Sequence, residues 1–338
     1  MHLAIMRQNQ INVSIALSDN VNTRPVIDGR VRPQGVQLCT TVLHPSEMFW
    51  RQLKYQEFDV SEMSLSSLLI SWANGNRDWV AIPVFTSRHF FHTWALKSLS
   101  AGIDHPRDLK GKRVGVPEYQ QTAAIWSRGV LQHEFGVAPD EIQWFMERGT
   151  NRSHGAATSF TPPKGVEVVQ IAADADIGSM MLKGELDATL LHLNGGNLVD
   201  RSRTELNGAA AIRPLFDDVG KECRRYYRKT NLYPINHTLV MRRSIHERHP
   251  WLALNLFKAF QEAKKSQSAT SSEILKSYVD TGAVCSDLNG ILERDPAPYG
   301  LVHNRTVLET IARYVHEQGL TEGLVPIDAV FAPSTLDI

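Results

Sequence analysis

The sequence contains few cysteines, and their positions fit none of the usual cysteine-based frameworks. Three cysteines, Cys39, Cys223 and Cys285, are spread over 338 residues, and no C-x-x-C pair occurs. An odd number of widely spaced cysteines argues against a disulfide framework and against a structural zinc site. We therefore expect buried free thiols in a reducing compartment.

Neither sign of charge is in excess. Lys plus Arg number 36, and Asp plus Glu also number 36. A balanced surface gives no electrostatic reason to expect nucleic acid or an anionic membrane as a partner. It leaves room for a local cationic site that would bind an acidic small molecule.

Long apolar runs are also missing. No stretch approaches the roughly 18 apolar residues that a membrane-spanning helix needs. Near the N-terminus, Arg7 and the polar run Gln8, Asn9 and Gln10 interrupt any secretory signal. The sequence therefore predicts a cytoplasmic protein without a membrane partner.

Several catalytic and cofactor motifs are absent as well. No G-x-G-x-x-G follows a strand, and there is no G-x-S-x-G, H-x-H or H-E-x-x-H. These absences argue against a nucleotide fold, a serine nucleophile and a motif-specified metal site. We expect no cofactor, and a divalent metal held by His with Asp or Glu stays an open alternative.

What the sequence does contain is a regular alternation of strand and helix patterns, which indicates α/β layers. Short β-branched or aromatic runs are followed by apolar residues at helical spacing. The expected strands are 12–17, 37–43, 58–64, 79–86, 90–96, 114–116, 141–147, 166–171 and 233–244. The expected helices begin at Pro45, Ser64, Thr122, Met180 and Ser244, with the second closed by Gly75 and the fourth running to Leu191.

The order of these elements predicts two α/β domains with a hinge and a cleft between them. The first domain would comprise residues 1–96 and 233–338, and the second would be the inserted segment 97–232. Ligands of open α/β sheets bind beyond the carboxyl ends of strands, at helix N-termini. The loops expected at the cleft are 18–24, 61–67, 86–92, 117–122 and 233–237.

Five segments carry a resemblance to a known family. They are IPVFTSRHFFHT (Ile82–Thr93), GKRVGVPEYQQTAAIWSRGVLQHEFGV (Gly111–Val137), MERGTNRSHGAATSFTPP (Met146–Pro163), MLKGELDA (Met181–Ala188) and INHTLVMR (Ile235–Arg242). Together they resemble the type 2 periplasmic-binding-protein fold and, more closely, the cytoplasmic 4,5-dihydroxyphthalate decarboxylases built on it. The S-R-x-F-x-H pattern and the R-S-H-G loop are the most discriminating parts.

The resemblance implies a cofactor-independent decarboxylase of phthalate catabolism that yields protocatechuate. Breaking the ring–carboxylate bond directly would leave an aryl anion that the ring cannot delocalise. Protonating that ring carbon first is easier, especially when the hydroxyl para to it is deprotonated. Such a site needs an acid, a base and a cation for the retained carboxylate, and it acts mainly by positioning and electrostatics.

Histidines suit the acid and base roles, because their pKa lies near working pH. The resemblance and the expected cleft favour His92 and His237 as catalytic residues, although either could be a hydrogen-bonded core residue. Glu62 is a third catalytic candidate, which could orient a histidine or cap the next helix. His154, in the loop 151–163, is expected to contact the substrate, and a surface histidine is the alternative.

Arginine matches the two oxygens of a carboxylate, so Arg88 and Arg24 are the candidates for carboxylate binding, with a structural salt bridge as the alternative. Ser18, from the first strand end, is a further substrate-binding candidate. The start of the helix at Thr122 offers free N–H groups and forms an expected anion half-site, for which a well-capped helix start is the alternative. Its members would be Tyr119, Gln120, Gln121 and Thr122. Beside them, Glu118 would have to point away, pair with an arginine or handle a proton.

Two other functions remain open at this point. A solute-binding protein for an aromatic dicarboxylate would use the same fold without reaction, although the missing export signal counts against it. A different lyase or hydrolase for another ring carboxylate would be distinguished by the loop 151–163. In every case the expected partner is a small aromatic dicarboxylate, and the helical C-terminal part could support a homo-oligomer.

Overall fold

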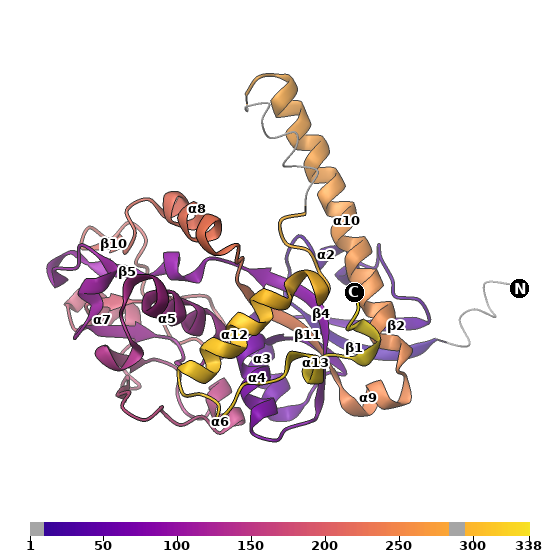
Figure 1. Cartoon of the computed structure of the whole chain (residues 1–338), viewed down its shortest axis with the longest axis horizontal. Coiled ribbons are helices and arrows are strands. Elements are labelled where there is room, and N and C mark those ends of the chain that lie inside the picture. The colour runs from indigo at the N-terminus through magenta and orange to yellow at the C-terminus, as the bar shows by residue number, and fades with distance from the viewer. Residues whose placement is uncertain (1–9, 284–294) are drawn as a thin grey trace, which may run out of the picture.

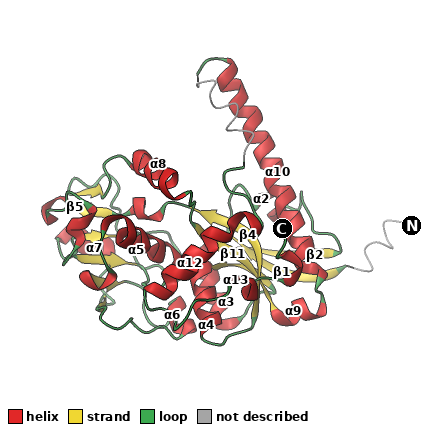
Figure 2. Cartoon of the chain, viewed as in Figure 1, coloured by secondary structure: helices red, strands yellow, loops and turns green. Residues whose placement is uncertain are grey.

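The computed structural model describes residues 10–283 and 295–338, and it is built on two mixed β-sheets (Figure 1). The five-stranded sheet has the order β2-β1-β3-β11-β4, and the six-stranded sheet has the order β10-β5-β9-β6-β7-β8. Figure 2 shows the strands gathered in two separate groups with helices around each. We call the part built on the five-stranded sheet the first lobe and the part built on the six-stranded sheet the second lobe.

The first sheet combines consecutive parallel strands with one strand that returns from far along the chain. β1 is parallel to β2 and β3, whereas β11 lies antiparallel between β3 and β4. All five residues of β3 and seven of the eight residues of β11 are buried, as expected for central strands covered on both faces. The bounds are β1 Ile11–Leu17, β2 Val36–Val42, β3 Val60–Ser64, β4 Trp79–Arg88 and β11 Ile235–Arg242.

The second sheet has a parallel centre and an antiparallel edge. β6 is parallel to β7 and β9, and β7 is parallel to β8, while β5 lies antiparallel between β9 and β10. The bounds are β5 Leu96–Ser98, β6 Arg113–Val116, β7 Gln143–Met146, β8 Val168–Gln170, β9 Ala188–Thr189 and β10 Ile212–Pro214. The expected domain boundaries at residues 96 and 232 stay a prediction, although Leu96 already pairs with Thr189 in this sheet.

Helices cover both sheets and join them. α12 packs against α4 of the first lobe and α5 of the second, and Figure 1 shows it crossing between the two sheets. The distal half of α10 extends away from the body of the molecule (Figure 1). The bounds are α2 Arg24–Ile27, α3 Pro45–Tyr55, α4 Leu65–Ala73, α5 Thr122–Phe135, α6 His154–Thr158, α7 Ile177–Lys183, α8 Val219–Thr230, α9 Arg243–Arg248, α10 Trp251–Asp280, α12 Arg305–Glu317 and α13 Ile327–Val330. None of the helices in the described ranges has the length and apolar character required to span a membrane.

Three sequence-based expectations are corrected by the structure. The expected strand 90–96 is a 3-10 helix over Phe91–Trp94, fixed by a hydrogen bond from the Thr93 hydroxyl to the Phe90 carbonyl, and β5 begins after it. The expected helix 180–191 ends at Lys183, because Gly184 takes a left-handed conformation with φ of 72°.

The third correction concerns the cysteines. The thiols were expected to be buried, but Cys39 is exposed and Cys223 is partly exposed. Cys285 and the first nine residues, with Arg7 and its polar neighbours, lie outside the described residues.

Candidate active site

A cavity of about 210 Å³ lies between the two lobes, at the carboxyl ends of several strands. We call it the central cavity. It is the position that open α/β sheets favour for ligands, because the parallel strands end there and helices begin. The first lobe contributes His44, Ser46, Phe49, Ser64, Ser87, His89, Asn236 and His237, and the second contributes Gln121, Ala123, Arg148, His154, Leu191 and Leu193.

The walls of the central cavity suit a flat aromatic ring. Phe49, Phe91 and Trp94 supply aromatic faces and edges, and Leu191 and Leu193 supply aliphatic surface. Polar side chains line the cavity as well, and His237 and Arg148 are among them. Apolar surface combined with convergent polar groups is typical of small-molecule sites.

A second cavity of about 430 Å³ adjoins the first, and we call it the side cavity. The two share Pro45, Ser87, His89 and His237 as lining residues. The side cavity adds polar groups of the first lobe, namely Ser18, Asp19, Asn20, Asn22, Thr86, Arg88, Tyr233 and Lys264. His237 therefore stands at the junction between an aromatic compartment and a polar one.

His237 and Glu62 form a buried pair on neighbouring strands of the first sheet. Because β11 runs antiparallel to β3, His237 lies opposite Ser64, and its Nδ1 comes within 3.2 Å of Glu62 Oε2. The carboxylate also accepts hydrogen bonds from the Ser18 N–H and hydroxyl, both at 2.7 Å, and from the Thr86 hydroxyl at 2.5 Å. Every partner of Glu62 is thus a hydrogen-bond donor.

These donors decide the charge of Glu62. Burial pushes its pKa upward, but the hydrogen bond and charge of His237 and the hydroxyls of Thr86 and Ser18 outweigh burial and leave the pKa of Glu62 below its ordinary value. An ionised carboxylate only accepts hydrogen bonds, so Nδ1 of His237 must carry a proton. On the other side of the ring, Nε2 lies 2.7 Å from Asn236 Nδ2, and Phe49 packs edge-on with centroids 4.7 Å apart.

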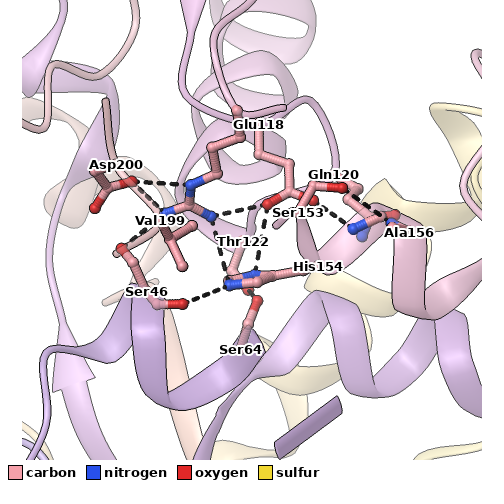
Figure 3. Close-up of polar contacts among 12 residues, drawn as sticks. Ser46, Ser64, Glu118, Gln120, Thr122, Ser153, His154, Ala156, Val199 and Asp200 are labelled. Atoms are coloured by element: carbon pink, nitrogen blue, oxygen red, sulfur yellow. Dashed lines mark hydrogen bonds and ion pairs between the residues drawn. The ribbon is translucent and has the colours of Figure 1, made fainter. Parts of the chain in front are cut away.

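The second lobe contributes a buried ionic cluster around Arg148. Its Nη1 donates to Glu118 at 2.8 Å, its Nε donates to Asp200 at 2.9 Å, and its Nη2 donates to the Ser46 hydroxyl at 2.7 Å. All three ionic side chains are fully buried. Two carboxylates therefore share one guanidinium, which leaves this wall with an excess of negative charge. Figure 3 shows Glu118 and Asp200 converging on this cluster with Ser46 below.

His154 sits at the edge of the same cluster, held between the lobes (Figure 3). Its Nε2 lies 3.1 Å from the Ser46 carbonyl oxygen and so donates to it, while Nδ1 lies 3.7 Å from Glu118 Oε2. Burial lowers the pKa of His154, Glu118 opposes that effect, and Arg148 adds to it. The ring is therefore neutral, and its buried Nδ1 has no hydrogen-bond partner among the described residues.

The expected anion half-site at the start of α5 forms only in part. Gln121 lines the central cavity, and its Oε1 lacks a hydrogen-bond partner among the described residues. Thr122 instead bonds across the cleft, to the Ser64 hydroxyl at 2.8 Å and to the Ser66 N–H at 3.0 Å. Gln120 pairs with Thr158, and Glu118 pairs with Arg148, which was one of the alternatives left open.

Within this half-site, Tyr119 differs most from its predicted role as a substrate contact. Its ring is fully buried in the second lobe, with the guanidinium of Arg128 3.7 Å from the ring centroid. It lines neither cavity, because the strand-to-helix turn directs it into the core beside Trp144. The predicted substrate contacts of Tyr119, Gln120 and Thr122 are therefore replaced by structural ones.

His92 and Arg24 also lie away from both cavities. His92 is 2% exposed, and its Nε2 lies 3.1 Å from Glu222, because the 3-10 turn points the ring toward α8 rather than the cleft. Arg24 is exposed and forms a salt bridge of 2.8 Å with Asp19. In the structure, His92 is a hydrogen-bonded core histidine, and Arg24 forms an exposed salt bridge. These are the structural alternatives given above for the two residues.

Arg88 does line the side cavity, and its bonding is unusual for a buried cation. It is 7% exposed and donates to the carbonyl oxygens of Tyr233 and Pro298 and to Asn304 Oδ1, at 3.3, 2.7 and 2.6 Å. These partners are all neutral. Burial lowers the pKa of Arg88 to about 10, which still leaves the guanidinium charged at neutral pH.

Of the predicted residues, the structure thus brings His237, Glu62, Ser18, Arg88, His154 and Gln121 to the two cavities or directly behind them. Sequence reasoning missed Arg148, His89, Asn236 and Asp200. Arg148 lies two residues after the end of β7, so the strand-end rule would have found it. Asn236 had no such signal, because regular strand alternation would point it away from His237.

The described residues offer no arrangement of three or more His, Cys, Asp or Glu side chains that could hold a metal ion. The expectation of a cofactor-free enzyme stays a prediction.

The chain resembles known proteins in sequence and in structure. No family model matches the chain. A 4,5-dihydroxyphthalate decarboxylase of Comamonas testosteroni is 32% identical over 332 residues, which cover 97% of this chain and 98% of that protein. A 4,5-dihydroxyphthalate decarboxylase of Pseudomonas putida is 36% identical over 184 residues, covering 54% of this chain and 70% of that protein.

Solved structures show the fold. The periplasmic aliphatic sulphonate binding protein SsuA from Escherichia coli superimposes with a TM-score of 0.54 at 15% identity, covering 95% of this chain and 91% of SsuA. At this identity the likeness concerns the fold alone. The chain therefore has a periplasmic-binding-protein-like fold, with the central cavity between its lobes.

Proposed function

The chain belongs to the 4,5-dihydroxyphthalate decarboxylase family and is a carboxy-lyase, and from this premise we propose its substrate and the roles of its residues. The proposed reaction removes one carboxylate of 4,5-dihydroxyphthalate and gives protocatechuate and carbon dioxide. The observation that carries the proposal is the His237–Glu62 pair at the junction of the two cavities.

His237 is the proposed acid. Its Nε2 delivers a proton to the ring carbon that bears the departing carboxylate, so that a C–H bond forms as the N–H bond breaks. The C–C bond to the carboxylate then breaks, its electron pair returns to the ring, and carbon dioxide leaves. Glu62 holds the ring through Nδ1 and stabilises the imidazolium before the transfer, as a carboxylate behind a histidine does in other acid–base sites.

The charges of the two compartments orient the substrate. Arg88 in the side cavity has only neutral partners, so the retained carboxylate is expected on that side of His237. Behind the second-lobe wall, two buried carboxylates share one arginine, and this net negative charge disfavours a carboxylate on that side. The catechol edge therefore faces the second lobe, and the ring lies between Phe49, Phe91 and Trp94.

His154 is the proposed base at the catechol edge. A neutral imidazole can take the proton of the hydroxyl para to the reacting carbon, which pushes electron density onto that carbon before it is protonated. After carbon dioxide leaves, the phenolate regains this proton and His237 is reprotonated by solvent. The overall balance is one substrate and one proton to one product and one carbon dioxide, and no organic cofactor takes part.

Incubation of the purified protein with 4,5-dihydroxyphthalate tests the proposal, with protocatechuate followed by chromatography. In deuterated water the product should carry one deuterium, at the ring position that lost the carboxylate. The matched control is His237→Asn, which keeps a donor toward Glu62 but cannot supply the proton.

Two results would overturn the proposal. One is the absence of product at high enzyme concentration, with or without added divalent metal. The other is binding of the substrate without turnover, which would return the protein to the solute-binding alternative.

A further inference from the structure

Asn236 occupies an irregular position in a central strand. Neighbouring residues of a regular strand point to opposite faces of the sheet, yet Asn236 and His237 both line the central cavity. The register of β11 against β4 shifts between Ile235 and His237 and again between His237 and Leu239. Such a bulge redirects a side chain, and here it brings the amide of Asn236 beside the imidazole that follows it.

The amide reaches the ring nitrogen opposite Glu62. Asn236 Nδ2 lies 2.7 Å from His237 Nε2, whereas Nδ1 is engaged by the carboxylate. With Nδ1 protonated, the neutral imidazole presents a lone pair at Nε2, and an amide N–H is the partner that this lone pair requires. The Oδ1 of Asn236 is buried, in a residue 8% exposed, and has no hydrogen-bond partner among the described residues.

An unpartnered buried oxygen calls for a physical reason, because such an atom normally costs stability. We propose that Asn236 is a positioning residue whose amide reverses with the proton on His237 Nε2. When Nε2 is bare, Nδ2 donates to it, and when Nε2 carries the proton, Oδ1 accepts from it. The same side chain would thus hold the ring in place before and after proton delivery, and the inference rests on the proposed function of His237.

No other charged or titratable group in the described structure takes this place. Glu62, on β3, meets the opposite nitrogen. His89, which follows β4, and His44, at the start of α3, face His237 electrostatically without a hydrogen bond to it. Phe49 contacts the ring edge-on and offers no acceptor. Without Asn236, the imidazole would be held by one hydrogen bond and would turn about it more freely.

The test uses the full-length protein without substrate. The ring nitrogens of His237 are observed by 15N NMR and assigned by their loss in His237→Asn. In the wild type, Nε2 should show the signal of an unprotonated nitrogen that accepts a hydrogen bond when the ring is neutral. Asn236→Leu, which is nearly isosteric and cannot hydrogen-bond, should shift that signal toward a free lone pair. Asn236→Asp should leave both nitrogens protonated at neutral pH.

Kinetics supply the second readout. Asn236→Leu is expected to lower kcat about tenfold, the loss of one hydrogen bond of ordinary strength, with KM little changed. Asn236→Ser, whose hydroxyl can donate or accept, should recover part of kcat, which a merely structural role would not predict. Circular dichroism and product binding confirm that each variant is folded.

Wild-type Nε2 signals and wild-type kcat in Asn236→Leu would overturn the inference. Equal losses of kcat in Asn236→Leu and Asn236→Ser would also overturn it. A wild-type protein that does not turn over 4,5-dihydroxyphthalate would instead contradict the proposed function, and the NMR result in the empty protein would still decide the role of Asn236 toward the ring.

Discussion

Each lobe presents one histidine to the central cavity with a buried glutamate behind it, Phe49 packs against both rings, and the two pairs differ in what else the glutamate binds. Glu62 meets His237 at 3.2 Å and otherwise accepts from neutral donors. Glu118 binds Arg148 at 2.8 Å and the Gly155 N–H, and His154 stands back at 3.7 Å.

In the proposed mechanism this difference separates the acid from the base. Glu62 has His237 as its nearest ionisable partner, so its charge acts mainly on that ring. A carboxylate already neutralised by arginine acts less on its histidine, and the arginine itself disfavours a second cation. The burial that lowers the pKa of His154 then keeps that ring neutral. The proposed mechanism therefore assigns opposite directions of proton transfer to two similar pairs.

Replacing His237 and His154 one at a time is the strongest test of whether the two histidines have different roles. His237→Asn keeps a donor toward Glu62, and His154→Gln keeps a donor toward Ser46. We expect kcat to fall by about a thousandfold in the first, because general acid catalysis contributes about 10²–10⁴-fold. The second should lose less, because an ionised catechol hydroxyl is only one part of the driving force. Steady-state kinetics measure both, and equal losses would contradict the assignment of separate roles.

Removing Arg148 should show how much stability the buried cluster of Arg148, Glu118 and Asp200 requires from its one cation. Arg148→Met leaves Glu118 and Asp200 buried without a cation, which should lower the free energy of unfolding by about 3–5 kcal/mol. Urea denaturation measures this loss. Adding Glu118→Gln and Asp200→Asn to the same chain should restore much of it.

Arg24→Met is the matched control for this prediction, because it breaks an exposed salt bridge and should leave stability unchanged. If Arg148→Met were as harmless as Arg24→Met, the cluster would not carry the buried charge that we assign to it.

The neutral state of His154 predicts a pH dependence of stability. Its pKa in the folded protein lies below the ordinary value of 6.5, so below that pH the unfolded chain binds the proton more readily. Stability from this group is complete above pH 6.5 and is lost as pH falls toward the folded pKa, by at most about 1.4 kcal/mol per pH unit.

His154→Gln should therefore flatten the decline of stability on the acid side, as measured by unfolding at a series of pH values. His92 has a pKa lowered by burial in the same direction, so its contribution persists in this variant and serves as the internal reference. An unchanged pH slope would contradict a neutral His154.

The smallest effect on activity is expected at His92. His92→Gln removes a ring that contacts Glu222 and Tyr226 but lines neither cavity, so kcat should be unchanged while thermal stability falls. A large loss of kcat in a folded variant would return His92 to the catalytic site where the sequence had placed it.

Much of the architecture could be predicted because its signals are local. Apolar alternation located β1, β3 and β11, and Pro45 and Gly75 marked the start of α3 and the end of α4. The prediction for the segment 90–96 failed because its aromatic residues fit a strand equally well. Its conformation depends on a side-chain hydrogen bond and on packing against α5 and α8, and no local pattern records either.

The site was harder for the same reason. His237 could be found because it lies on the strand that returns to the first sheet beside the expected cleft. The sequence predicts that Tyr119 and Thr122 contact a ligand, because a helix start that binds an anion has the same residues as one that packs against another element. Asn236 depends on a bulge, which is set by pairing with a strand about 150 residues earlier in the chain.

The hydrogen bond from the Ser66 N–H to the Thr122 hydroxyl joins the two lobes at the start of a helix. The first turn of α4 receives no cap from its own N-cap residue, Ser64, and Thr122 of the other lobe accepts its Ser66 N–H instead. Drawing the lobes apart would uncap α4, at a cost of about 1 kcal/mol unless water replaces the hydroxyl. Each exchange of product for fresh substrate through an opened cleft would then undo and remake a helix cap, supplied by a threonine that lies between two residues lining the central cavity.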